Sequence, residues 1–299
     1  MSVMTSYKNC YFHSQDNLRL YYRDYYHADN ALTPLLCLHG LTRNAADFNG
    51  FCEHFAPSRR IIVPDMRGRG KSAYDPHYKN YQIPTYLNDV LHLLTLLDME
   101  RVIVVGTSMG GLMAMGLAVA RPGLLEAVIL NDVGPEIDPA GLARIASYVG
   151  KTPVMEDWDQ AITALKKVNA GFYPDFTETD WAQMARNTFY EKDSQIIPNY
   201  DPLIGKAMAE AGTNLTDVNM WDLFTALKNI PTLTLRGELS DILSAKTLVE
   251  MQQRHPLMST ATIPNRGHVP LLTETVSLDA ITQFVSGLNH LPHPINEPK

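Results

Sequence analysis

Apolar runs and helical segments alternate along the first 130 residues of the chain. Four short apolar runs are typical of strands covered on both faces, at residues 35–38, 60–63, 102–105 and 127–130. Helices are predicted between them, at residues 44–55, 86–97 and 111–121. An aromatic-rich segment at 11–26 predicts an opening β-hairpin. Because strands that alternate with helices form right-handed crossovers, we predict a doubly wound, mostly parallel α/β sheet.

The alternation stops near residue 134 and resumes after residue 225. Helical patterns and six prolines fill the interval, and all three tryptophans of the chain fall within it. A strand, a helix, another strand and a closing helix follow. We therefore predict one α/β core at residues 1–134 and 226–288, an inserted helical cap at 135–225, and a polar, disordered tail at 289–299.

Composition narrows the class of protein. Of 299 residues, 45% are hydrophobic and 19% are charged, as in a soluble globular protein. A net charge of −7 without blocks of like charge gives no basic face, so no nucleic-acid partner is expected. No apolar run has the length of a signal peptide or a membrane span, so we expect a cytoplasmic protein without a membrane partner. Three cysteines without metal-type spacing fit a reducing compartment.

The run at 102–105 leads directly into a Gly-x-Ser-x-Gly motif made by Gly106, Ser108 and Gly110. To aim a serine hydroxyl off the end of a strand, the backbone must turn tightly in a strained conformation. Side chains two residues before or after the serine would collide with the neighbouring strand and helix, and glycine removes that collision. Ser108 is therefore a candidate nucleophile, and an ordinary turn serine is the alternative.

Two glycine-rich patterns after residue 63 resemble nucleotide-binding motifs. Gly68, Gly70 and Ala73 fit a loose G-x-G-x-x-A pattern, and residues 70–72 resemble the end of a P-loop. The following segment lacks an amphipathic helix, and Asp65 stands where the first P-loop glycine is required. We therefore expect no nucleotide site here.

A serine nucleophile needs a base to take its proton, and the base needs an acid to hold its tautomer. His268 follows the last predicted strand, on the same sheet edge as Ser108, and is the candidate base. Asp132, Glu238 and Asp241 also follow strands at that edge. We favour Asp241, because the interval to His268 has room for one helix and one strand. Asp132 is the main rival, and Glu238 is expected to be a turn residue.

An oxyanion hole requires two backbone N–H groups. Met109, directly after the candidate nucleophile, is expected to supply one, and Leu41 the other. Gly40 lets the second loop approach closely. We expect His39, at a strand end beside that glycine, to shape the loop rather than to act as a base.

Five motifs in order, LLCLHGLTRN, IVPDMRGRGKS, GTSMGG, RGELSD and NRGH, resemble the α/β-hydrolase fold family. The resemblance spans almost the whole chain outside the insertion. It implies a triad of Ser108, Asp241 and His268, with oxyanion donors at Leu41 and Met109. A serine at this turn is similar to the family's esterases, lactonases, carbon–carbon hydrolases, perhydrolases and prolyl aminopeptidases, whereas its haloalkane dehalogenases and epoxide hydrolases carry aspartate there.

We therefore predict a serine hydrolase that cleaves a small or medium, largely apolar ester or lactone through an acyl-enzyme. Its expected partner is a small-molecule substrate, with no metal or cofactor implied, and a homo-oligomer is left open. Carbon–carbon hydrolysis of a ring-cleavage product is a second hypothesis, and a non-catalytic ligand-binding protein is a third. The tryptophans and methionines of the insertion are expected to form its own core in preference to an apolar pocket, namely Trp158, Trp181, Trp221, Met155, Met184, Met208 and Met220.

Overall fold

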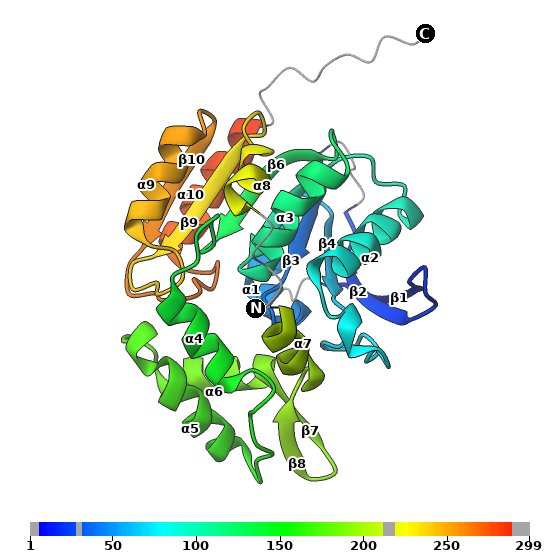
Figure 1. Cartoon of the computed structure of the whole chain (residues 1–299), viewed down its shortest axis with the longest axis vertical. Coiled ribbons are helices and arrows are strands. Elements are labelled where there is room, and N and C mark those ends of the chain that lie inside the picture. The colour runs from blue at the N-terminus through cyan, green and yellow to red at the C-terminus, as the bar shows by residue number, and fades with distance from the viewer. Residues whose placement is uncertain (1–5, 28–31, 212–218, 289–299) are drawn as a thin grey trace.

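A computed structural model of the chain describes residues 6–27, 32–211 and 219–288, so the predicted tail at 289–299 lies outside the described residues. A sheet of eight strands forms the centre of the described part, with helices on both faces (Figure 1). The strands are β1 (Lys8–His13), β2 (Arg19–Tyr25), β3 (Leu35–Leu38), β4 (Ile61–Asp65), β5 (Val102–Thr107), β6 (Leu125–Asn131), β9 (Thr232–Gly237) and β10 (Met258–Ile263). Their order is β1-β2-β4-β3-β5-β6-β9-β10.

Two apolar layers enclose this sheet. Along β3, Leu35 and Cys37 belong to one layer and Leu36 and Leu38 to the other, because successive side chains of a strand point to opposite faces. The first layer includes helices α1 (Asn49–Phe55) and α10 (Thr275–Leu288). The second includes α2 (Ile83–Leu96), α3 (Met109–Ala120), α8 (Met220–Thr225) and α9 (Ala245–Arg254). Since β1–β2 and β2–β4 are antiparallel and the other neighbouring pairs parallel, the predicted doubly wound, mostly parallel sheet is confirmed.

The ends of several elements differ slightly from the prediction. The strand predicted at 60–63 continues to Asp65. The helix predicted at 86–97 begins earlier, at Ile83, because Pro84 fits the first turn of a helix, where no N–H is required. The predicted hairpin turn is present, and Asn17 adopts the left-handed conformation that such a turn favours, with φ of 64°.

An insertion in the chain separates β6 from β9. Its elements are α4 (Pro139–Tyr148), α5 (Trp158–Asn169), the short 3-10 helix η3 (Ala170–Phe172), α6 (Glu178–Thr188), β7 (Phe189–Lys192), β8 (Gln195–Pro198) and α7 (Leu203–Ala211). We define the cap as residues 139–211. Figure 1 shows α4, α5, α6 and the β7–β8 pair gathered beyond one end of the sheet. The remaining helix of the insertion, α8, instead packs its buried Phe224 into the core layer that contains α3.

The antiparallel β7–β8 pair differs from the purely helical insertion that the sequence pattern predicts. Helical periodicity holds up to Thr188, where α6 ends. Asp193 and Ser194 then take φ values of 51° and 60°. Two consecutive left-handed residues make the turn that joins two antiparallel strands without splaying them. The left-handed conformation of these two residues therefore forms a β-hairpin where the helical pattern ends.

Arg67 anchors the glycine-rich loop that follows β4. Its side chain is 2% exposed, and its Nη1 atom lies 2.8 Å from Asp16 and 2.6 Å from Asp75. Its Nη2 atom lies 2.6 Å from Asp89 of α2. The hydrogen bond from Arg67 outweighs the effect of burial and lowers the pKa of Asp16 to about 2. This loop is thus tied internally to the hairpin turn and to α2.

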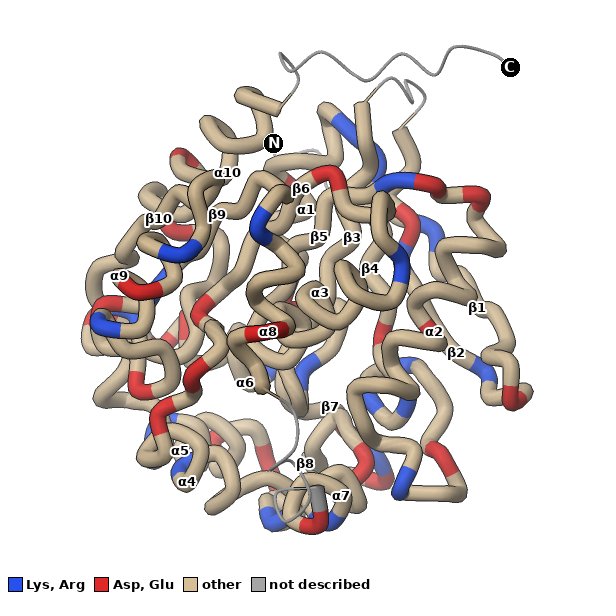
Figure 2. The backbone as a smooth tube through the Cα atoms, turned by 45° about the horizontal axis from the view of Figure 1, so that its top comes forward, with Lys and Arg blue, Asp and Glu red and all other residues tan. Residues whose placement is uncertain are grey.

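Charges of both signs are spread along the backbone (Figure 2). None of the described helices combines the length and apolar content that crossing a bilayer requires, and α2 and α10 have 14 residues each. Within the described ranges, no group of three or more His, Cys, Asp and Glu side chains is arranged to hold a metal ion.

Replacing Arg67 tests the role of its buried carboxylate cluster. Arg67→Met leaves Asp75 and Asp89 buried without their counter-charge, so we expect the free energy of unfolding to fall by about 3–5 kcal/mol. Arg101→Met is the control, because Arg101 is 44% exposed and lies 3.7 Å from Glu126. That long pair, with Arg101 half-exposed, should contribute less than about 1 kcal/mol. Urea denaturation measures both changes, and equal losses would contradict the assignment.

Candidate active site

The turn between β5 and α3 holds Ser108 in a strained conformation, with φ of 52° and ψ of −115°. A Cβ atom on Gly106 would lie 2.5 Å from the carbonyl oxygen of Gly110 in α3. A Cβ atom on Gly110 would lie 2.0 Å from the carbonyl oxygen of Leu38 in β3. Both predicted collisions, one with the helix and one with the neighbouring strand, are confirmed, so glycine is required at both positions.

The loop after β3 approaches this turn from the other side. A Cβ atom on Gly40 would lie 3.7 Å from the Cβ atom of Ser108, which is an ordinary van der Waals distance. The predicted close approach is therefore present, although a methyl group would fit there. Leu41, next along the loop, borders the same cavity as Ser108. Met109 begins α3, and the first N–H groups of a helix lack acceptors within it.

His39 shapes this loop, as the sequence predicts. It is fully buried, with Nδ1 2.7 Å from the carbonyl oxygen of Gly40. The backbone N–H of Met66 donates to Nε2 at 3.0 Å. Because that N–H can only donate, the proton of the neutral ring belongs on Nδ1. Burial lowers the pKa of His39 to about 4, so the ring is neutral near pH 7.

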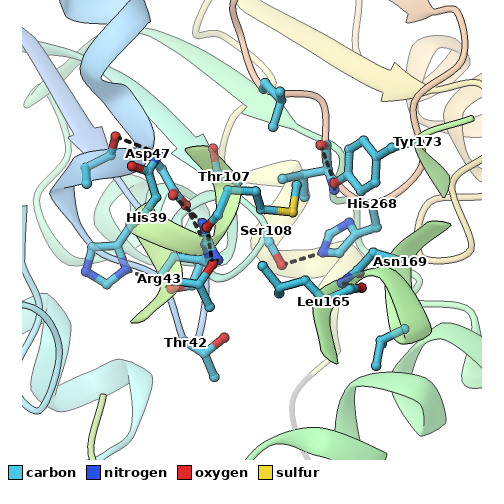
Figure 3. A pocket seen from close by; sticks show the side chains of 18 of the residues that line it. His39, Thr42, Arg43, Asp47, Thr107, Ser108, Leu165, Asn169, Tyr173 and His268 are labelled. Atoms are coloured by element: carbon cyan, nitrogen blue, oxygen red, sulfur yellow. Dashed lines mark hydrogen bonds and ion pairs between the residues drawn. The ribbon is translucent and has the colours of Figure 1, made fainter. Parts of the chain in front are cut away.

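Ser108, His268 and Asp132 form one hydrogen-bonded chain. His268 Nε2 lies 2.9 Å from Ser108 Oγ, a contact drawn in Figure 3. His268 Nδ1 lies 2.8 Å from Asp132 Oδ2. The side chains of His268 and Asp132 are 8% and 0% exposed. If the serine hydroxyl donates to Nε2, the imidazole proton lies on Nδ1 and is donated to the carboxylate. This arrangement suits proton removal from Ser108.

Both carboxylate oxygens of Asp132 have hydrogen-bond partners. Asp132 directly follows β6, with φ of 56°. Its Oδ1 atom accepts the N–H of Gly237 at 2.9 Å. Its Oδ2 atom accepts the hydroxyl of Ser240 at 2.6 Å and also faces His268. These donors come from the end of β9 and the loop after it, so they hold the buried carboxylate in one orientation.

The prediction that Asp241 is the partner of His268 is wrong. Both oxygens of Asp241 accept hydrogen bonds from Arg144 of α4, at 2.6 Å and 2.8 Å. Burial alone would raise the pKa of Asp241, but the hydrogen bonds and charge of Arg144 outweigh it, and the pKa is lowered. The loop after β9 contributes Ser240 to Asp132 instead of a carboxylate to His268. Glu238 accepts the N–H of Asn265, as befits the turn residue that was predicted.

A cavity of about 950 Å³ opens over Ser108 and is bordered by core loops and by the cap. Figure 3 shows Leu165 and Asn169 of α5 beside Ser108 and His268. No tryptophan is among the described residues that line the cavity, and Met184 alone lines it among the four methionines named above. Met155 and Trp158 belong to a small apolar cluster inside the cap. The expectation that the cap's large side chains form its own core is therefore confirmed for these two.

Two arginines beside the site were missed from the sequence. Arg43 forms a two-pronged ion pair with Asp47, at 2.7 Å and 2.6 Å, and donates to the hydroxyl of Thr188 in the cap. Arg69 is fully buried and donates to the carbonyl oxygen of Leu41 at 2.9 Å. It also donates to the hydroxyl of Tyr86 at 2.8 Å. For Arg69, the available sequence signal was its position in a glycine-rich loop where no phosphate is expected to bind. The guanidinium donors of such an arginine need acceptors elsewhere in the protein.

The comparison with known families agrees with this geometry. The sequence model of the alpha/beta hydrolase family matches residues 35–278. The chain belongs to the alpha/beta hydrolase family. The resemblance carried by the five sequence motifs is thus confirmed.

Several relatives of this alpha/beta hydrolase match it over most of their length. The 3-hydroxybutyrate-oligomer hydrolase of Cupriavidus necator is 31% identical over 263 residues, which cover 85% of this chain and 88% of that protein. The 2-(acetamidomethylene)succinate hydrolase of Mesorhizobium japonicum is 27% identical over 255 residues, covering 84% and 87%. The crystal structure of an alpha/beta hydrolase from Novosphingobium aromaticivorans superposes with a TM-score of 0.90 at 41% identity, covering 95% of this chain and 99% of that one.

The neutral His39 predicts a pH dependence of stability. Its pKa in the folded state lies below the ordinary value, so the unfolded state takes up the proton first, and the contribution of His39 falls as the pH drops from about 6.5 towards 4. Between about pH 7 and pH 4.5, wild type should lose about 2–3 kcal/mol of unfolding free energy relative to His39→Gln. Urea denaturation of both proteins at each pH measures this. A constant difference would contradict a neutral, buried His39.

Proposed function

We propose that this alpha/beta hydrolase is a serine hydrolase that cleaves a carboxylic ester through a covalent acyl-enzyme on Ser108. The observation that carries the proposal is the continuous hydrogen-bonded chain from Ser108 Oγ through His268 to Asp132. A serine hydroxyl is a weak nucleophile until such a base removes its proton. Ser108 and His268 both line a large cavity, which supports the same conclusion, since a substrate can reach the hydroxyl.

In the first half of the reaction, His268 Nε2 takes the Ser108 proton as Oγ attacks the ester carbonyl carbon. The C–Oγ bond forms, and the carbonyl electron pair moves onto oxygen. As this intermediate collapses, the ester C–O bond breaks, and His268 gives its proton to the leaving alkoxide. Asp132 holds the ring orientation and stabilises the transient imidazolium.

In the second half, water replaces the alcohol. His268 takes a proton from water, whose oxygen attacks the acyl carbon. The bond to Ser108 Oγ then breaks, and the proton returns to Oγ, which releases the carboxylic acid. No redox or metal chemistry enters either half.

The N–H groups of Leu41 and Met109 are the proposed oxyanion donors. Both belong to turns that flank Ser108, and the helix that begins at Met109 adds a favourable dipole. Arg69 supports this role indirectly, because it fixes the carbonyl oxygen of Leu41. Each donor is expected to stabilise the transition state by about 3 kcal/mol.

For the substrate, we propose a short linear ester of hydroxy acids. The relative from Cupriavidus necator is named for hydrolysis of 3-hydroxybutyrate oligomers. The cavity volume of about 950 Å³ lies near the upper end for small-molecule sites and suits a chain of several units. Polar groups such as those of Asn169 and Thr188 line it together with apolar ones such as Leu165. A mixed lining of this kind suits ester groups that alternate with short apolar segments.

Substitutions of the two candidate acids test the proposed chain. Ser108→Ala should abolish ester turnover, and Asp132→Asn should lower kcat on the order of 10⁴-fold, because the imidazole loses its orienting carboxylate. Asp241→Asn is the matched control, since Asp241 pairs with Arg144, and its kcat should stay close to that of wild type. Steady-state kinetics on a p-nitrophenyl ester measures all three. The proposal fails if Asp132→Asn retains near-normal kcat.

A substrate panel tests the proposed chemical class. We expect kcat/KM to be higher for dimers and trimers of 3-hydroxybutyrate than for p-nitrophenyl butyrate, a lactone or a vinylogous 1,5-diketone from ring cleavage. Ser108→Ala run on every compound gives the background rate. Faster turnover of the diketone would favour carbon–carbon hydrolysis, and faster turnover of the lactone would favour a lactonase. No turnover of any compound, together with no labelling by a fluorophosphonate, would favour a ligand-binding protein.

A further inference from the structure

The cap holds the loop that carries His268. The backbone N–H of Gly267, just before His268, donates to the carbonyl oxygen of Phe172 at 2.7 Å. The N–H of Val269, just after it, donates to the hydroxyl of Tyr173 at 2.9 Å. That hydroxyl in turn donates to the carbonyl oxygen of Val269 at 2.9 Å. The residues on both sides of His268 are therefore hydrogen-bonded to two consecutive cap residues, and the bond to Tyr173 holds the His268–Val269 peptide group itself.

The core binds the backbone of this loop at Arg266 and at Pro270. The carbonyl oxygen of Arg266 accepts the N–H of Leu239 at 2.8 Å. The carbonyl oxygen of Pro270 accepts the side-chain amide of Asn131 at 2.9 Å. Before His268, core and cap thus hold the same peptide group, Arg266–Gly267, whereas the His268–Val269 peptide group is bound by Tyr173 of the cap.

Tyr173 is itself rigidly placed. Its side chain is buried, and its ring centroid lies 4.6 Å from that of Phe176 and 6.1 Å from that of Trp181, both in the cap. Burial raises the pKa of Tyr173 well above its ordinary value, so the hydroxyl remains a donor at any working pH. Figure 3 shows Tyr173 beside His268. The aromatic side chains of the cap thus hold the Tyr173 hydroxyl in place for its hydrogen bonds with Val269.

The loop that carries His268 is closely packed against the cap. A Cβ atom on Gly267 would lie 2.4 Å from the Cβ atom of Phe172. Backbone therefore packs directly on the cap at this point. Arg266 adds an ion pair with Asp175, three residues further along the cap.

We propose that Tyr173 is a positioning residue, whose hydroxyl clamps the Val269 peptide and keeps the His268 imidazole aligned between Ser108 and Asp132. The inference rests on the proposed function, because it takes His268 as the base. It gives the cap a second role besides bordering the cavity. Displacement of the cap would release the base as well as open the site, so the catalytic geometry is complete only when the cap is seated.

Tyr173→Phe tests this inference, because it removes the hydroxyl and keeps the ring. We expect kcat for a p-nitrophenyl ester to fall about 10- to 100-fold, as misplacement of a reacting group by about 1 Å can cost that much. KM should change little, because the cavity wall is retained. A purely structural role would lower thermal stability without this selective loss of kcat.

Tyr81→Phe is the matched control. The hydroxyl of Tyr81 donates to Asp201 of the cap at 2.6 Å and accepts the N–H of Asp75 at 2.8 Å. It is buried like Tyr173 and also joins core to cap, but it lies outside the residues that line the cavity. Its loss should lower the melting temperature about as much as Tyr173→Phe does, while kcat stays near that of wild type.

The double variant Tyr173→Phe with His268→Ala separates the possible outcomes. If Tyr173 acts through His268, its replacement should add no further loss of kcat once the imidazole is gone. Near-normal kcat in Tyr173→Phe, with His268→Ala inactive, overturns the positioning role alone. An equal loss of kcat in Tyr81→Phe, or a further loss in the double variant, also overturns it. Near-normal kcat in His268→Ala overturns the proposed function, and with it this inference.

Discussion

The imidazole of His268 must face Ser108 with one nitrogen and Asp132 with the other, and the rest of the site depends on this constraint. The sheet order makes it feasible, because β5, β6, β9 and β10 are parallel neighbours and their carboxyl ends meet at one edge. Ser108 follows β5, Asp132 follows β6 and His268 follows β10. A rigid sheet thus sets the distances between three loops that are far apart in sequence.

Buried polar groups hold those loops still. Asp132 is placed by donors from the end of β9 and the loop after it, and Arg69 fixes the loop of Leu41. His39, which burial keeps neutral, joins the same loop to the backbone of Met66 by a hydrogen bond. A buried donor or acceptor without its partner is costly, so each bond restricts the loop to one conformation. The same logic extends to the cap, whose Tyr173 reaches across to the loop of His268.

The fold and the proximity of Ser108 and His268 were predictable from sequence because their signals are local. Apolar runs mark buried strands, and the spacing of glycines around Ser108 reflects collisions that the structure contains. The carboxylate beside His268 was not predictable, because carboxylates follow both β6 and β9 at one edge and spacing does not say which of them faces His268. Arg144, which is far from Asp241 in sequence, binds both oxygens of Asp241 and so keeps this carboxylate from pairing with His268. Tyr173 has no local signal at all, since its role exists only where the cap meets the core.

Trapping an acyl-enzyme is the most direct test of whether Ser108 acts as a covalent nucleophile. The protein is mixed with excess p-nitrophenyl ester, quenched in acid during turnover, digested and examined by peptide mass spectrometry. We predict one added acyl group, on the peptide that contains Ser108, and its absence in Ser108→Ala. An acyl group on another residue, or ester turnover that persists in Ser108→Ala, would contradict the account.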